Sequence, residues 1–411
     1  SEAGNGELTM KNFTFHVPTK IVFGEKTELE VCKEIAALGG RRVLLHYGSN
    51  SAKRSGLVDR VASSMRESGL HVVELGGVQP NPRLSLIREG IVLCRKEEID
   101  FVLAVGGGSV IDSAKAIALG TMNPDKDLWK DLILPRAVTK KCLPVGVILT
   151  IAASGSEMSH NMTTTNDDDP CSMIKTGYGN PYIRPKFSIL NPELTYTLPA
   201  YQTSSGCADI MMHSIERFFT TTTGNEMSDY IAIAVLKTIV KYTPVALEKP
   251  DDYQARSEIM WAGTVSHNSL TNLGSVACFP IHQLGHELSG KFDVAHGASL
   301  TAMWGSWARY VCQKVRPTRF AELGARLFGH PSCGDPVEDA QRAIESMERF
   351  FRSIGMPTCL EELTGVLSQE ELEDMTIKCT RNRTKTIVGI YPLEYDDVLA
   401  IYQAANKEKV G

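Results

Sequence analysis

Short apolar runs alternate with helical patterns along the first half of the chain. Four runs have the length and composition of buried strands: 43–47, 71–75, 99–105 and 143–149. Gly, Pro or Asn residues follow the first three runs, and apolar residues at helical spacing occupy 57–65. Strands that alternate with helices in this way predict parallel strands joined by crossover helices, which is an α/β layer structure.

The pattern changes after Asn191-Pro192. Beyond this point the sequence contains long stretches with helical periodicity, such as 227–247 and 338–354, and no convincing strand. We therefore expect two domains. An α/β dinucleotide-binding domain with a parallel sheet should span residues 1–194, and an all-helical metal-binding and catalytic domain should span residues 195–411.

Composition narrows the class of protein. Of the 411 residues, 43% are apolar and 22% are charged, which excludes a disordered chain. The net charge of −5 shows no surplus of basic residues that would bind nucleic acid or a membrane surface. No apolar run approaches the ~18 residues of a membrane span, and the first residues do not resemble a signal peptide. Ten single cysteines without a CxxC pair favour a reducing cytoplasm. Met10 suggests that residues 1–9 are an artificial extension.

A glycine-rich turn follows the third apolar run. Gly106, Gly107, Gly108 and Ser109 stand directly before a helical pattern over 110–119. A strand, a glycine turn and a helix N-terminus in this order form an anion site, because free N–H groups of the first helical turn can donate to a pyrophosphate. Ser109 could also cap that helix. The turn does not match GxGxxG, so a tight turn without a ligand is the alternative interpretation.

A second loop of small and hydroxyl residues, from Thr150 to Glu157, follows the fourth run. Because the carboxyl ends of neighbouring parallel strands meet at one edge of a sheet, the two loops could face one crevice. Asp112 and Lys115 are three residues apart and are expected on one face of the helix behind the glycine turn.

The turn after the first run bears on the choice between NADP and NAD. It contains Gly48, Ser49, Asn50 and Ser51, followed by the cations Lys53 and Arg54. A carboxylate at this place would bind a ribose 2′-hydroxyl and repel a 2′-phosphate. The turn has no carboxylate and therefore favours NADP(H) over NAD(H), although an ordinary polar turn would look the same.

A carboxylate and several histidines have metal-ligand spacing in the second half. Asp209 and His213 are four residues apart in a helical stretch and share a face, on which Glu216 also lies. His282 and His286 are likewise four residues apart. One carboxylate and two or three imidazoles suit Fe(II) or Zn(II).

The arrangement of the second histidine group is less determined. Gly285, Gly290 and Gly297 interrupt it, so we expect His296 to return from a loop. The zincin motif HExxH fails because residue 290 is glycine. Spacing alone does not decide whether His282 or His286 is the ligand.

Together these elements resemble the iron-containing (group III) alcohol dehydrogenase family. The resemblance rests on Lys20-Ile-Val-Phe-Gly24, Gly106-Gly-Gly-Ser-Val-Ile-Asp112 with Lys115, Gly155-Ser-Glu157, Asn191-Pro-Glu-Leu-Thr-Tyr-Thr-Leu-Pro199, Asp209-x3-His213-x2-Glu216 and His282-Gln-Leu-Gly-His286-Glu-Leu…His296-Gly297. Tyr47-Gly-Ser-Asn-Ser51 and Met260-Trp-Ala262 are most similar to the branch of NADP-dependent butanol dehydrogenases and aldehyde reductases. Ile151-Ala-Ala153 departs from common members, in which Thr or Pro is usual at these positions.

The resemblance implies a dehydroquinate synthase-like architecture with the active site between an N-terminal dinucleotide-binding domain and a helical domain. It implies that the metal ligands are Asp209, His213, His282 and His296. His286 would then be an unligated catalytic residue near the nicotinamide and the substrate. The residues implied for the cofactor are Gly106, Gly107, Gly108 and Ser109 at the pyrophosphate, together with Asp112, Thr150 and Lys175.

The expected function is that of a metal-dependent alcohol dehydrogenase or aldehyde reductase. It would transfer a hydride between NADP(H) and a small primary alcohol or aldehyde, with Fe²⁺ in preference to Zn²⁺, in a cytoplasmic homodimer. The alternatives are a glycerol-type or hydroxyacid-type dehydrogenase of the same superfamily, a metal-dependent hydrolase, and a nucleotide-binding regulator without turnover.

Overall fold

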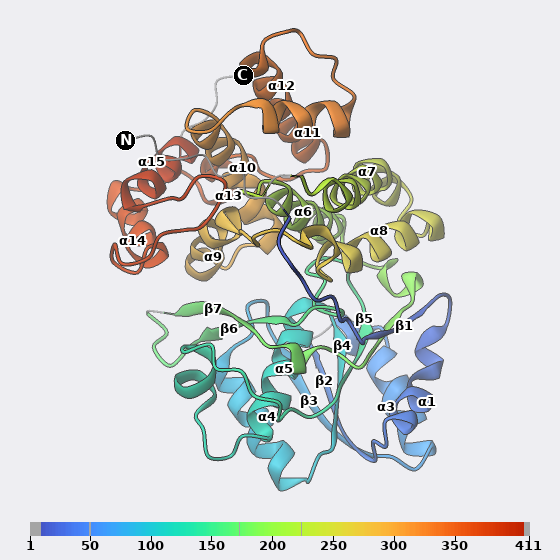
Figure 1. Cartoon of the computed structure of the whole chain (residues 1–411). Coiled ribbons are helices and arrows are strands. Elements are labelled where there is room, and N and C mark those ends of the chain that lie inside the picture. The colour runs from blue at the N-terminus through green and yellow to red at the C-terminus, as the bar shows by residue number, and fades with distance from the viewer. Residues whose placement is uncertain (1–9, 49–50, 172, 223, 407–411) are drawn as a thin grey trace. The chain divides into compact units, whose positions relative to one another are not determined.

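A six-stranded parallel sheet forms the centre of the first half of the chain in the computed structural model, which describes residues 10–48, 51–171, 173–222 and 224–406 (Figure 1). Across the sheet, the strands are β1 (Lys20–Phe23), β8 (Phe187–Leu190), β5 (Val145–Leu149), β4 (Phe101–Gly106), β2 (Arg42–Gly48) and β3 (His71–Val78). All five strand pairings are parallel. β3 lies on one side of β2 and β4 on the other, so the chain reverses direction across the sheet between β2 and β4. An open parallel sheet binds its ligand beyond the carboxyl ends of the strands at such a reversal.

Helices connect these strands. They are η1 (Thr27–Glu30), α1 (Val31–Ala37), α2 (Ser51–Arg54), α3 (Leu57–Glu67), α4 (Leu84–Lys96), α5 (Gly108–Thr121), η2 (Leu128–Ile133) and η3 (Pro181–Ile183). η4 (Pro192–Thr195) follows β8, and α8 (Tyr253–Ser266) comes later in the chain and packs against η4. Helices α1 and α3 share one hydrophobic core with the sheet. Successive strand residues point to opposite faces of the sheet, so His46 of β2 points away from that core. Its ring contacts Ser113 of α5, and α5 therefore covers the opposite face. The predicted α/β layer structure is confirmed.

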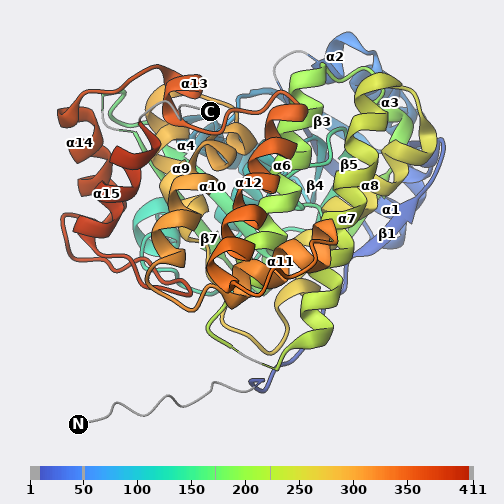
Figure 2. The same ribbon diagram turned by 90° about the horizontal axis from the view of Figure 1, so that it is seen from above.

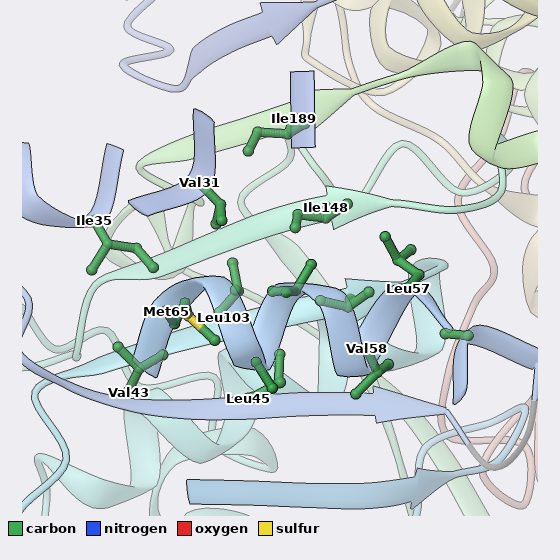
Figure 3. Packing of buried hydrophobic residues seen from close by; sticks show 14 of the residues in the cluster. Val31, Ile35, Val43, Leu45, Leu57, Val58, Met65, Leu103, Ile148 and Ile189 are labelled. Atoms are coloured by element: carbon green, nitrogen blue, oxygen red, sulfur yellow. The ribbon is translucent and has the colours of Figure 1, made fainter. Parts of the chain in front are cut away.

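The core beneath α3 explains the apolar spacing in the sequence (Figure 3). Leu57, Val58 and Met65 lie on one side of the helix and are buried against Leu45 of β2 and Leu103 of β4. Each such side chain contributes about 1.5–3 kcal/mol by leaving water. The alternation of strand residues and the helical period of α3 therefore point to the same buried surface.

A separate two-stranded antiparallel sheet follows β5. It consists of β6 (Asn161–Asn166) and β7 (Ile174–Gly179). Neither strand was expected, because Thr, Asn and Gly dominate both segments and no apolar alternation marks them.

Helices make up the second half of the chain (Figure 2). They are α6 (Ala200–Phe218), α7 (Glu226–Glu248), η5 (Leu270–Asn272), α9 (Pro280–Phe292), α10 (His296–Cys312), α11 (Thr318–Phe328), α12 (Pro336–Ser353), α13 (Leu360–Thr364), α14 (Gln369–Cys379) and α15 (Tyr395–Ala405). Among the described residues after β8, extended pairing is limited to an isolated bridge between Ile387 and Leu393. The expectation of an all-helical second half is confirmed.

Contacts within the chain define two compact units. The sheet unit comprises residues 16–198 and 249–268, so α8 belongs to it. The helical unit comprises the described residues of 10–15, 199–248 and 269–406. A domain boundary at residue 195 stays a prediction.

The sequence was expected to contain no segment long and apolar enough to span a membrane, and helix α7 is an exception. Its length and composition would allow it to cross a bilayer. A core helix of a soluble protein passes the same test, and α7 packs against α6 within the helical unit. Its length and apolarity are therefore only a weak indication of a membrane span.

Candidate metal centre and cofactor turn

Helix α6 presents three functional side chains on one buried face. Asp209, His213 and Glu216 follow one another at spacings of four and three residues and are at most 5% exposed. These spacings place the side chains above one another along the helix, as the sequence predicted. Helix α10 packs against both α6 and α9, so three helices enclose this face (Figure 2).

The second histidine group is carried by α9 and α10. His282 and His286 lie on α9 as expected, and Gly285 and Gly290 are inside that helix rather than at a break. His296 does not return from a loop: it is the first residue of α10. The glycine pattern was misleading because Gly297 serves close packing. A Cβ on Gly297 would lie 1.9 Å from the backbone oxygen of Ser205 in α6.

Three imidazoles surround one carboxylate oxygen at this centre. Asp209 Oδ1 lies 3.4 Å from His213 Nδ1, 3.5 Å from His282 Nε2 and 3.7 Å from His296 Nε2. Ligand atoms about 2.1 Å from a tetrahedral metal ion are separated from one another by about 3.4 Å. The donor atoms of Asp209, His282 and His296 also lie within 4.8 Å of one another; His213 is not part of that set. Asp209, His282 and His296 are therefore brought together with separations that suit a divalent cation, and His213 lies close to Asp209.

The charges at this centre also suit a cation. His282 Nε2 is buried and makes no hydrogen bond within the described part of the chain. Burial lowers the pKa of His282, but the carboxylates of Glu216 and Asp209 outweigh burial and raise that pKa to about 9. Burial holds the pKa of His213 well below its usual value. The two carboxylates thus favour a positive charge at this centre, and either a proton or a metal ion can supply it.

Glu216 has a role that the sequence did not reveal. Its Oε2 accepts a hydrogen bond from His282 Nδ1, and its Oε1 accepts hydrogen bonds from the backbone N–H groups of Ile281 and His282. A proton held on Nδ1 leaves the lone pair of Nε2 directed toward Asp209. Carboxylates of this kind fix the tautomer and orientation of a ligating histidine. The signal was available, since Glu216 shares the helix face of Asp209 and His213.

His286 lies beside this cluster, on the next turn of α9. Its ring centroid is 5.5 Å from that of His296 and 6.3 Å from that of His282, and its side chain is half-buried. It is not among the three residues whose donor atoms lie within 4.8 Å of one another, a set that does not include His213 either. The geometry is therefore compatible with an unligated His286.

The glycine turn lies at the carboxyl end of β4, next to the reversal in the sheet. Gly106 ends β4, Gly107 precedes the helix and α5 begins at Gly108. The residue at the N-cap is therefore Gly107, and Ser109 does not cap the helix as expected, because it already lies in the first helical turn. Backbone N–H groups of this turn remain suited to an anion.

The loop after β5 fills the space that side chains at Gly107 and Gly108 would occupy. A Cβ on Gly107 would lie 2.3 Å from Ile151, and one on Gly108 would lie 2.2 Å from Ser154. Thr150 donates its backbone N–H to the oxygen of Gly106. The two loops predicted to meet at neighbouring strand ends are thus in contact, and glycine is required for their close approach.

Asp112 is buried behind this turn and is engaged by the protein. Its Oδ1 accepts a hydrogen bond from Ser156, and its Oδ2 accepts bonds from the backbone N–H and the hydroxyl of Thr163. Contact of Asp112 with a cofactor stays a prediction. Lys175, on β7, donates to Asn81 Oδ1 at 2.9 Å, and its contact with a cofactor is likewise a prediction.

The turn after β2 can be described only in part. Gly48 ends β2, Ser49 and Asn50 lie outside the described residues, and only the backbone of Ser51 is described, at the start of α2. Two carboxylates from neighbouring elements reach this turn, although it contains none of its own. Lys53 lies 3.1 Å from Asp59 of α3 and 3.2 Å from Glu74 of β3.

Comparison with known proteins identifies the family. Residues 18–192 match iron-containing alcohol dehydrogenase, and residues 203–406 match the C-terminal part of the Fe-containing alcohol dehydrogenase family. NADH-dependent butanol dehydrogenase A of Clostridium acetobutylicum is 38% identical over 394 residues, which cover 96% of this chain and 99% of that protein. NADPH-dependent aldehyde reductase YqhD of Escherichia coli is 32% identical and covers 86% of this chain and 89% of its own length.

Solved structures agree with these matches. The crystal structure of NADH-dependent butanol dehydrogenase A from Thermotoga maritima superimposes with a TM-score of 0.91 at 35% identity, covering 97% of this chain and all of that one. The resemblance inferred from the motifs and the expected fold class are both confirmed. The chain belongs to the iron-containing alcohol dehydrogenase family and is an oxidoreductase of that family.

Proposed function

We propose that this enzyme transfers a hydride between a nicotinamide cofactor and a small primary alcohol or aldehyde. Asp209, His213, His282 and His296 would hold one divalent metal ion, Fe²⁺ in preference to Zn²⁺. The observation that carries the proposal is the convergence of three imidazole nitrogens on Asp209 Oδ1 at 3.4–3.7 Å. Butanol dehydrogenases and an aldehyde reductase among the relatives support the substrate class.

The chemistry divides between the bound groups and the side chains of this chain. When bound, the metal supplies Lewis acidity for a substrate oxygen and the nicotinamide supplies or accepts the hydride. Glu216 keeps the proton of His282 on Nδ1 and so keeps Nε2 free to act as a ligand. The N–H groups at the start of α5 would hold the pyrophosphate. These residues bind and orient; they do not react covalently.

His286 is the proposed route for the proton. Its half-buried imidazole lies beside the ligand cluster and can exchange a ring proton with solvent. His286→Ala should retain the metal and lower kcat by about 10²-fold, in the range that general acid–base groups contribute. Metal analysis and a pH–rate profile check this expectation. Loss of the metal from His286→Ala would show instead that His286 is a ligand.

The cofactor proposed is NADP(H), because residues 48–54 contain no carboxylate and two cations. NAD(H) is the alternative, since several relatives are named NADH-dependent and Lys53 is paired with Asp59 and Glu74. Glu74→Gln removes one of these carboxylates from the turn. If the turn binds a 2′-phosphate, this variant should lower KM for NADPH severalfold and leave KM for NADH unchanged. An equal effect on both cofactors would contradict the assignment.

The direct test of function is steady-state kinetics with NADPH and NADH, after separate reconstitution with Fe²⁺ and Zn²⁺. Straight-chain aldehydes of two to six carbons should be reduced with higher kcat/KM than dihydroxyacetone or a 2-oxoacid. A preference for dihydroxyacetone or the oxoacid would favour a glycerol-type or hydroxyacid-type dehydrogenase. Ester hydrolysis without nicotinamide turnover would favour a hydrolase.

We also propose a cytoplasmic homodimer. Sedimentation of the purified protein should give twice the 45.1 kDa chain mass. A monomer at assay concentration would overturn the assembly without affecting the proposed reaction.

A further inference from the structure

The loop between β5 and β6 is irregular in conformation but buried. Residues 150–160 form neither helix nor strand, yet Ser156, Glu157 and Ser159 are at most 3% exposed. A buried irregular backbone needs partners for its carbonyl groups, because unpaired ones are costly away from water. The partners of these carbonyls therefore determine the shape of the loop.

Lys115 of α5 is the partner of two of those carbonyls and of the carbonyl that follows the loop. Its side chain is fully buried, and its Nζ donates to the backbone oxygens of Ser156 at 2.7 Å, Ser159 at 3.0 Å and Asn161 at 2.8 Å. The hydroxyl of Ser156 is a fourth acceptor at 2.8 Å. Two loop carbonyls and the carbonyl of the first residue of β6 thus converge on one ammonium group, in the way that backbone oxygens surround a bound cation.

Asp112 completes the arrangement one helical turn earlier. It receives the Ser156 hydroxyl proton at 2.6 Å and binds the first residues of β6 through Thr163. Ser156 therefore bridges the two charges, accepting from Lys115 and donating to Asp112. Together Lys115 and Asp112 hold both ends of the segment from 156 to 163 on α5.

The same helix begins at the glycine turn. Ile151 and Ser154 of the loop occupy the space beside Gly107 and Gly108, so the shape of the loop defines one side of the anion-binding turn. We propose that Lys115 and Asp112 are positioning residues, which fix loop 150–160 against the N-terminus of α5 and thereby form the surface that receives the cofactor pyrophosphate. This inference rests on the proposed function, because it assumes that a nicotinamide cofactor binds there.

The energetics favour positioning over simple stabilisation. Burial raises the pKa of Asp112 and lowers that of Lys115 to about 8, so each charge is held at a cost. Buried ion pairs can often be replaced by apolar residues without loss of stability. Stability alone therefore does not explain why Lys115 and Asp112 are buried together. Carbonyl groups that converge on a cation, in contrast, define one conformation of the loop.

Lys115→Met tests the inference, because it keeps the length of the side chain and removes the ammonium group. We expect Kd and KM for NADPH to rise at least about tenfold, equivalent to about 1.4 kcal/mol of binding. The metal content should be unchanged, and kcat at saturating NADPH should stay within about threefold, since the groups that would bind substrate are intact. NADPH should also raise the melting temperature of the variant less than that of the wild type.

Asn123→Ala is the matched control. Asn123 is a buried residue beyond the other end of α5 whose amide donates to Leu119 and Lys141, away from the loop. The Asn123→Ala substitution should lower the melting temperature of the protein without changing its Kd for NADPH. A structural role alone would make Lys115→Met behave in the same way, and that result would overturn the inference.

Ser156→Ala keeps the test decisive if Lys115→Met does not fold. This variant removes only the hydroxyl bridge and leaves both charges in place, so Kd for NADPH should rise about threefold, because about one hydrogen bond is lost. An unchanged Kd would contradict the inference. If the wild-type protein itself binds neither NADPH nor NADH, the proposed function fails, and that outcome is distinct from a failure of these variants.

Discussion

The sheet unit and the helical unit each bury a cluster of charged side chains, and the clusters differ in the source of their positive charge. In the sheet unit the ammonium group of Lys115 lies among four oxygens of the chain. In the helical unit the carboxylates of Asp209 and Glu216 lie among imidazoles, and His282 Nε2 has no hydrogen bond within the described residues.

The two buried polar sites therefore differ in what they can do. A cation on a side chain cannot leave the site, and it fixes the conformation of the loop around it. Donor atoms held about as far apart as metal ligands are suited to a cation from solvent. The first cluster therefore shapes a binding surface, and the second is proposed to bind the ion that takes part in the reaction.

The largest expected effect comes from removing a metal ligand. His213→Ala should lose the metal and reduce turnover by about 10³-fold, because Lewis-acid catalysis is worth several kcal/mol and about 1.4 kcal/mol corresponds to tenfold. Metal analysis and aldehyde reduction measure both effects. His46→Gln, which alters a buried histidine bonded to Leu75 and Ser113 in the sheet unit, is the control and should retain the metal. Full turnover in metal-free His213→Ala would contradict the proposal that the cluster in the helical unit binds the ion needed for the reaction.

A smaller effect is expected from separating the helices that carry the ligands. Gly297→Ala places a methyl group against the backbone of Ser205 and should destabilise the protein by about 3 kcal/mol, the upper end for overpacking. Gly290→Ala is the matched control, because nothing lies within 4 Å of its added Cβ and alanine favours a helix by about 1 kcal/mol. Chemical denaturation measures both. Equal stability of the two variants would show that α6 and α10 are not in close contact at Gly297.

The next effect concerns the orientation of His282. Glu216→Gln should weaken metal binding by about 10–100-fold, as loss of a carboxylate behind a ligating histidine does. Competition with a chelator gives the affinity. Glu348→Gln should leave that affinity unchanged, because Glu348 is a buried carboxylate that pairs with Arg309 elsewhere in the helical unit. If both variants bind metal equally well, Glu216 does not orient a ligand.

The smallest effect depends on pH. Burial raises the pKa of Glu287 on α9 to about 7, from 4.5. Between these values the folded protein holds a proton that the unfolded chain has lost, so this group's contribution to stability is full below pH 4.5 and declines as pH rises through 7. Glu287→Gln should therefore stabilise the protein by about 2 kcal/mol at pH 6 and change its stability by less than about 0.5 kcal/mol at pH 4.5. Exposed Glu370→Gln should have no effect at either pH, and a similar response of both variants would contradict the assignment.

The sequence predicted the parts of the fold that follow from local patterns. The strands at 43–47 and 71–75 and the spacing of Asp209 and His213 were recognisable because each depends on residues close in the chain. The pairing of β6 with β7 was not, since its residues are polar. His296 was misplaced because Gly297 suggested a chain break, whereas the glycine is required by contact with Ser205.

The roles of Lys115 and Glu216 depend on contacts that spacing does not encode. Lys115 meets oxygens more than forty positions away, and Glu216 meets His282 across two helices. Spacing placed both residues on the correct helix faces but gave no partner for either. The choice between His282 and His286 was also left open by spacing, and only the three-dimensional arrangement brings His282 Nε2 toward Asp209.

The most direct test of the proposed metal-dependent reaction is the rate of aldehyde-dependent NADPH oxidation by the wild-type protein before chelation, after chelation and after return of Fe²⁺ or Zn²⁺. We predict that turnover disappears with the metal and is restored when the metal is returned, while NADPH binding persists throughout. Undiminished turnover in protein shown to be free of metal would contradict the proposed metal-dependent reaction.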